Sequence, residues 1–159
     1  AHDGRSVLLK FFVTEEELRT QVTKCNGPVW EDSCVEFFVC FDTNGYYNFE
    51  CNAIGTVLAA FGKNKKERQF LPEHLLSRIL SDTKFCHSEN GYIWEMVMVI
   101  PGELFIHHAI SSLRGMVSKG NFYKCGDRLV KPHYLAWSKI AADHPDFHLP
   151  EFFGTIFFE

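Results

Sequence analysis

Hydrophobic and polar residues alternate along much of the chain, as they do in β-strands that bury one face. The alternation predicts strands at residues 6–13 (SVLLKFFV) and 33–41. Residues 42–45 (DTNG) form the expected turn into residues 46–60 (YYNFECNAIGTVLAA), which predict one long strand or two short strands broken at Gly55. Repeated strands separated by turn residues are typical of an all-β protein.

The rest of the chain continues this pattern, with few helical segments. Residues 83–88 and 92–100 predict a second hairpin that turns at 89–91 (ENG), and further strands are expected within 113–125 and 145–159. Short helical turns are expected at 14–21, from a T-x-x-E capping box, at 71–80, after Pro72, and at 101–108. We therefore expect an antiparallel β-sandwich of the jelly-roll or immunoglobulin-like kind, with one or two short helices, in one domain spanning residues 1–159.

Two strands interrupt the hydrophobic pattern on one face. Glu36 lies in the middle of an apolar strand, six residues after Trp30, and the next strand places Tyr46, Asn48, Glu50 and Asn52 on one face. If the two strands are neighbours, these polar groups share one side of the sheet and must be exposed or hydrogen-bonded. A solvent-facing sheet surface explains the pattern, but an exposed Trp beside carboxylates and amides also suits a pyranose, whose C–H face packs on indole and whose hydroxyls need polar partners.

Composition narrows the functional classes. The formal net charge of −4 argues against general affinity for nucleic acid, and the basic run at 63–69 (KNKKERQ) is interpreted as a solvated loop. No apolar stretch approaches the roughly 20 residues that span a bilayer. The chain starts without Met, so we expect it to begin inside the domain, with an export signal and a first strand missing. The six cysteines have no C-x-x-C spacing, and we expect buried free thiols, with one or more disulfides as the alternative.

Several motifs together resemble the family 9 carbohydrate-binding modules, especially stand-alone family 9-like proteins of gut Bacteroidetes. The motifs are VWEDSCVEFFV, GYYNFECNAIGTVLAAFG, IWEMVMVIP, GNFYKCGDRLVKPHYLAWS and PDFHLPEFFGTIFFE, and they cover nearly all of the chain in order. The resemblance implies a β-sandwich that binds xylan- or glucan-type sugars without cleaving them, in carbohydrate catabolism. An extracellular or periplasmic location follows from that function.

The resemblance also assigns roles to particular residues. Trp30 would be one stacking plate and Glu36 a hydroxyl acceptor, with Trp137 as the candidate second plate. The other residues implied to contact the sugar are Glu50, Asn52, Asn121, Lys124 and His133. His148 is expected to make structural hydrogen bonds. Related modules carry structural calcium, which keeps calcium open as a cofactor, although the turn at Asp42–Asn44 lacks the ligand series of a calcium loop.

Two other functions remain open at this point. A glycoside hydrolase would need two carboxylates about 5–10 Å apart, which Glu36 and Glu50 could supply, although a flat sheet face offers little means of excluding water. A haem-binding sandwich would need Met and His ligands, for which Met96, Met98 and Met116 are available. Met96 and Met98 share a strand face with Trp94, and we expect all three to fill the core.

Overall fold

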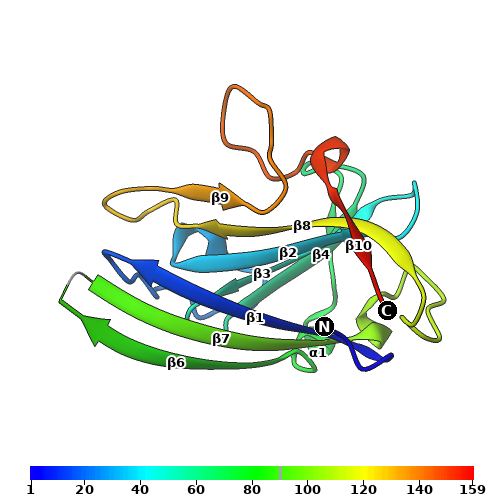
Figure 1. The fold of residues 1–159 in the computed structure, drawn as a ribbon, viewed down its shortest axis with the longest axis horizontal. Coiled ribbons are helices and arrows are strands. Elements are labelled where there is room, and N and C mark those ends of the chain that lie inside the picture. Colours follow the sequence, from blue (N-terminus) through cyan, green and yellow to red (C-terminus); the bar gives the residue numbers. More distant parts are fainter. Residues whose placement is uncertain (90) are drawn as a thin grey trace.

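Two antiparallel sheets pack face to face in the computed structural model, which describes residues 1–89 and 91–159 (Figure 1). One sheet has the strand order β1-β7-β6, and the other has the order β10-β8-β2-β3-β4-β5 with β9 paired to β8. The two chain ends lie close together at one end of the sandwich, where the His2 ring contacts the backbone oxygen of Glu159. The predicted β-sandwich is confirmed.

The elements follow the chain in this order: β1 (Ser6–Glu15), η1 (Val29–Glu31), β2 (Cys34–Cys40), β3 (Tyr46–Asn52), β4 (Val57–Gly62), β5 (Gln69–Phe70), α1 (Glu73–Leu76), β6 (Leu80–Ser88), β7 (Gly91–Pro101), η2 (Gly102–Leu104), β8 (Val117–Cys125), β9 (Tyr134–Ala136), η3 (Pro150–Phe152) and β10 (Gly154–Phe157). The η elements are single 3₁₀ turns. Within the described residues, no helix is long and apolar enough to cross a membrane.

The core is formed by the inward positions of the alternating strands. Val35, Phe37 and Val39 of β2 face Trp94 and its neighbours on β7, and Trp94 is fully buried. Met96 and Met98 are 0% and 1% exposed, which confirms that they fill the core. They are therefore packed among apolar side chains, an arrangement that does not favour the haem hypothesis.

The strand predictions are largely confirmed, and Gly55 explains the break between β3 and β4. Gly55 has a φ of +85°, a left-handed conformation that glycine adopts without steric cost, so the segment forms two strands joined by a turn. The predicted turn at 89–91 includes residue 90, which lies outside the described residues.

The helix predictions are less accurate. Residues 14–21 form no helix, because β1 extends through Glu15, whose carboxylate accepts a 2.6 Å hydrogen bond from Trp94 Nε1. That tertiary contact overrides the local capping signal. The helix expected over 71–80 is a single turn, α1, because Leu80 instead pairs with Val99 as the first residue of β6.

Candidate functional site

The polar face of β2, β3 and β8 is covered, contrary to the expectation that it is open to solvent. Glu36 and Glu50, which are direct ladder partners, are only 3% and 2% exposed. The chain after β8 rises over this face as a loop (Figure 1), and Tyr123 Oη donates to the backbone oxygen of Phe147 in that loop at 3.1 Å. The sheet alone would have been open, and segments distant in sequence close it.

A small cavity of about 70 Å³ remains under this cover, and we call it the Trp30 pocket. Its lining includes three of the predicted residues, Trp30, Glu36 and Glu50. The remaining lining residues are Lys65, Arg68, Cys125, Asp127, Tyr134, Pro145, Asp146, Phe147 and His148. Aromatic rings and charged groups therefore meet in one cavity, as in pockets for polar ligands.

Buried hydrogen bonds hold the segment that carries Trp30. Asp32 follows η1, and its Oδ2 accepts from Val22 N at 2.8 Å and from Asn52 Nδ2 at 2.9 Å. Asn52 also donates to the Val22 backbone oxygen and accepts from Thr56 N. Asn52, which was predicted to contact sugar, does not line the Trp30 pocket. Its side chain instead hydrogen-bonds to Val22 and Asp32, on either side of the turn that carries Trp30.

An ion pair and a neutral histidine form one wall of the pocket. Arg68 Nη1 lies 2.9 Å from Glu50 Oε1 and 3.3 Å from His148 Nε2. Burial, with Arg68 and Lys65 nearby, lowers the pKa of His148 to about 3, so the ring is neutral at pH 7. Because Arg68 can only donate, Nε2 must be the acceptor, and Nδ1–H therefore donates to Tyr46 Oη at 2.8 Å. His148 makes the structural hydrogen bonds expected of it and also lines the pocket.

Glu36 forms no ion pair within the described residues, although Arg68 lies near enough to oppose the rise in the pKa of Glu36. Its Oε1 accepts a 3.1 Å hydrogen bond from Cys125 Sγ, which is the one side-chain hydrogen bond to Glu36 among the described residues. Burial raises the pKa of Glu36 well above its ordinary range, and the nearby Cys125 and Glu50 raise it further. Burial also raises the pKa of Glu50, but Arg68 acts in the opposite direction. The two adjacent carboxyls are therefore in different electrostatic surroundings.

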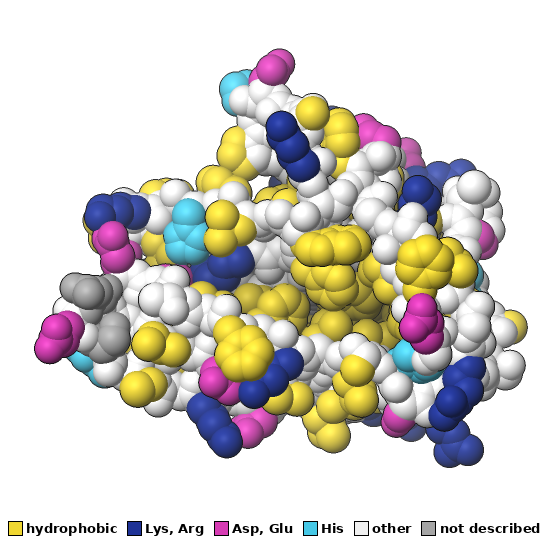
Figure 2. Space-filling view, in the orientation of Figure 1, with side chains coloured by type: hydrophobic (Ala, Val, Ile, Leu, Met, Phe, Trp, Pro, Cys, Tyr) yellow, Lys and Arg dark blue, Asp and Glu magenta, His cyan; other side chains and the backbone are white. Residues whose placement is uncertain are grey.

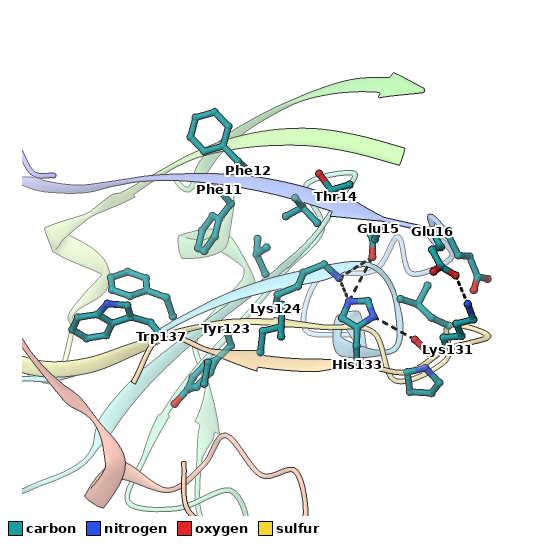
Figure 3. A pocket seen from close by; sticks show the side chains of 18 of the residues that line it. Phe11, Phe12, Thr14, Glu15, Glu16, Tyr123, Lys124, Lys131, His133 and Trp137 are labelled. Carbon is teal, nitrogen blue, oxygen red and sulfur yellow. Dashed lines mark hydrogen bonds and ion pairs between the residues drawn. The ribbon is translucent and has the colours of Figure 1, made fainter. Parts of the chain in front are cut away.

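The other predicted residues lie outside the Trp30 pocket. Asn121 points to the same face, but its side chain is bonded to the backbone of Ser138. Asn121 Nδ2 donates to Ser138 O at 2.9 Å, and Asn121 Oδ1 accepts from Ser138 N at 2.8 Å. Lys124 lies on the opposite side of β8, where its Nζ is 2.9 Å from Glu15 Oε2 and 3.0 Å from His133 Nε2 (Figure 3). The eight predicted residues therefore do not form one surface, and sugar contact by the outlying ones stays a prediction.

Lys124, His133 and Trp137 instead line a larger groove of about 880 Å³ between β1 and β8–β9. Figure 2 shows this hollow between the two sheets, with hydrophobic side chains at its floor. Trp137 is 58% exposed and packs edge-on against Phe122, with its ring close over Gly154. Trp137 also lines a third cavity of about 400 Å³, which shares Tyr134, Pro145, Asp146 and Phe147 with the Trp30 pocket. Trp137 and Trp30 line no common cavity, and their pairing as two plates stays a prediction.

Arg68, Tyr134 and Phe147 line the pocket but were not identified from the sequence. The basic run at 63–69 was interpreted as solvated, and most of it is exposed, but the Arg68 side chain is only 10% exposed because it pairs with Glu50. A buried carboxylate is costly unless it is paired or protonated, and Arg68 is the partner of Glu50. No signal in the sequence identifies this pair, because the burial of Glu50 depends on a cover formed by distant segments.

The structure offers one cluster of metal-binding side chains among the described residues: Cys34, Glu36 and Cys125. The six cysteines are all free thiols. At the turn after β2, Asp42 accepts hydrogen bonds from the backbone and side chain of Asn44, as in a hairpin turn. Structural calcium stays a prediction.

Comparison with known proteins adds three findings. A family model described as carbohydrate-binding family 9 matches residues 1–158. The structure of a proposed carbohydrate-binding protein from Bacteroides uniformis is 44% identical, with a TM-score of 0.93 over 100% of this chain and 76% of that one. A family 9 carbohydrate-binding module from Caldicellulosiruptor kristjanssonii, solved in complex with glucose, is 14% identical, with a TM-score of 0.59 over 97% of this chain and 71% of that one, and shares the fold. A search of curated proteins found no significant match.

Proposed function

The chain belongs to carbohydrate-binding family 9, and we propose that it binds xylan- or glucan-type oligosaccharides or polysaccharides, without cleaving them, at the Trp30 pocket. The observation that carries this proposal is that Trp30, Glu36 and Glu50 line one cavity. We extend the proposal to an extracellular or periplasmic role in polysaccharide breakdown. The glucose bound to the Caldicellulosiruptor module supports a sugar as the ligand class.

The chemistry of the pocket suits the edge of one pyranose unit, because a cavity of about 70 Å³ is too small to enclose the whole ring. The half-buried Trp30 indole offers an apolar plate for the C–H face of the ring. Glu36 has acceptor capacity beyond the Cys125 hydrogen bond, and Arg68 adds guanidinium donors to the same cavity. Sugar hydroxyl groups both donate and accept hydrogen bonds. They can therefore donate to Glu36 and accept from Arg68 when the sugar displaces water from the pocket.

The carboxylates are poorly arranged for glycoside hydrolysis. Glu36 and Glu50 occupy the same rung of the β2–β3 ladder, so they project from one wall and do not flank a scissile bond. Glu50 is also tied to Arg68 at 2.9 Å and accepts from Asn48 Nδ2. We expect purified protein to release no reducing sugar from xylan or β-glucan.

A fluorescence titration tests the proposal. In a Trp137→Phe background, Trp30 and Trp94 are the remaining tryptophans, and emission should change on adding cello- or xylo-oligosaccharides. We expect a dissociation constant between about 1 μM and 1 mM, corresponding to roughly −8 to −4 kcal/mol. Trp30→Ala should abolish binding measured by calorimetry, because the stacking surface is lost.

Phe12→Ala is the matched aromatic control, since the exposed Phe12 ring lines the groove between β1 and β8–β9 and does not line the Trp30 pocket. It should leave sugar affinity unchanged. Retained binding by Trp30→Ala, or no binding across a broad glycan panel, would contradict the proposal.

A further inference from the structure

Two thiols and one carboxylate meet at the base of the Trp30 pocket. Cys34 on β2 is the direct ladder partner of Cys125 on β8, and Glu36 lies two residues further along the same face of β2. The two Sγ atoms and a carboxylate oxygen of Glu36 all lie within 4.8 Å of one another. The adjacent strands therefore bring three potential ligand atoms together without any loop.

The surroundings of this cluster differ from those of an ordinary buried cysteine. Cys34, Cys125 and Glu36 are 0%, 1% and 3% exposed. A buried carboxylate is costly unless it is protonated or paired, and the ion pair in this pocket is made by Glu50. Cys125 and Glu36 line the pocket, so a small ion has a route to them.

We propose that Cys34, Cys125 and Glu36 form a three-ligand site for a thiophilic divalent cation such as Zn²⁺ or Cd²⁺. Zinc binds thiolate sulfur at about 2.3 Å and carboxylate oxygen at about 2.0–2.2 Å, so the donors of one site must lie a few ångströms apart, as these do. Water on the pocket side supplies the fourth ligand. Binding releases to solvent the two thiol protons, together with the Glu36 proton where that carboxyl is protonated, and the metal–sulfur bonds form without any change of oxidation state.

The protonation of the thiols sets the pH dependence of this site. Zn²⁺ and Cd²⁺ bind cysteine as the thiolate, so each thiol proton must leave before its sulfur can act as a ligand. The cation must therefore displace protons, and its apparent affinity should increase as the pH rises. If the proposed sugar site is correct, the cation also engages Glu36 and should compete with the sugar.

Cadmium alone is the probe for the first experiment. Replacing Cys25, Cys40 and Cys86 by Ser removes the thiols that are exposed or half-buried. The resulting protein, kept reduced with a phosphine, is titrated with Cd²⁺ while the ultraviolet thiolate-to-cadmium charge-transfer band is followed. We expect a band that saturates at one equivalent, with protons released into a weakly buffered solution.

Single substitutions in this background distinguish the proposed site from Cys51, the other cysteine that remains. Cys34→Ser or Cys125→Ser should weaken Cd²⁺ binding by more than the roughly 10–100-fold that loss of a mere outer-shell partner costs. Cys51→Ser is the matched control, since Cys51 is buried on the core face of β3 and should leave the band unchanged. Glu36→Gln keeps the size of the side chain and both thiols, and it should weaken binding at least about 10-fold.

No band in the reduced background protein, or a band that survives Cys125→Ser, would overturn the proposal. If circular dichroism shows that either serine variant does not fold, two other measurements test the proposal. Unchanged Cd²⁺ affinity in Glu36→Gln, or Cd²⁺ binding without proton release, would then overturn it. The spectrum is recorded without sugar, so this outcome is independent of the fluorescence titration.

Discussion

At the residue scale, Glu36 shows a conflict between stability and the proposed binding. Its side chain is 3% exposed, and burial raises its pKa because the charged form is disfavoured in the folded protein. Its presence in a hydrophobic strand could be predicted from the alternation of residues alone. Its burial could not, because the cover comes from residues near Phe147, more than a hundred positions away.

Replacing Glu36 by Gln should stabilise the protein at neutral pH while weakening sugar binding. Because the folded-state pKa is raised, wild-type stability falls as the pH rises through that pKa, and the neutral amide does not share this loss. The amide oxygen still accepts from Cys125. Thermal unfolding should therefore give a higher Tm for Glu36→Gln at pH 7, with the difference shrinking as the pH falls toward the ordinary carboxyl pKa of 4.5 and remaining constant below it.

Calorimetry completes this test. We expect the sugar affinity of Glu36→Gln to fall about 10-fold, as expected when one hydrogen bond between the carboxyl group and a sugar hydroxyl is lost. A lower Tm at pH 7, or a Tm difference that does not vary with pH, would show that the Glu36 carboxylate is stabilised in the fold.

At the element scale, the strands follow from local pattern and the connecting segments do not. β2 and β3 were predicted to be joined by a turn at residues 42–45, and the structure pairs them with Glu36 opposite Glu50, a register that the sequence did not predict. The path of residues 16–33 could not be predicted, because it is fixed by Asp32 and Asn52, whose contact links β3 to a segment twenty residues earlier. The hydrogen-bonding partner of a polar side chain is a tertiary property.

Asn52→Ala should destabilise the protein and weaken sugar binding only partly. The substitution leaves the Asp32 carboxylate, the Val22 carbonyl and the Thr56 amide without these partners. We expect a loss of about 2–4 kcal/mol in the free energy of unfolding, measured with urea. Sugar affinity, measured where the variant is fully folded, should fall less than in Trp30→Ala. Complete loss of binding in the folded variant would indicate direct contact between Asn52 and the sugar.

At the scale of the whole molecule, β8 separates two environments. Tyr123 and Cys125 face the covered polar side, whereas Lys124 between them enters the groove between the sheets and pairs with Glu15. Glu15 also accepts from Trp94 Nε1, so this contact joins β1, β7 and β8. The family motif assigned Lys124 to sugar contact together with its neighbours in the sequence. A motif gives the order of residues along a strand, but it does not say to which face of the sheet each side chain points.

Lys124→Met should therefore cost stability and leave sugar binding intact. It removes the cation from a carboxylate that is 7% exposed, and breaking a buried pair in this way costs roughly 3–5 kcal/mol. The double variant Glu15→Gln/Lys124→Met should recover most of that loss, because the amide oxygen still accepts from Trp94 and no buried charge remains unpaired. Urea unfolding measures the free energy of unfolding of the wild type, the single variant and the double variant. Calorimetry with the same oligosaccharide should give wild-type affinity for both variants. A fall in affinity for folded Lys124→Met would instead place Lys124 in the sugar site, as the resemblance to the family implied.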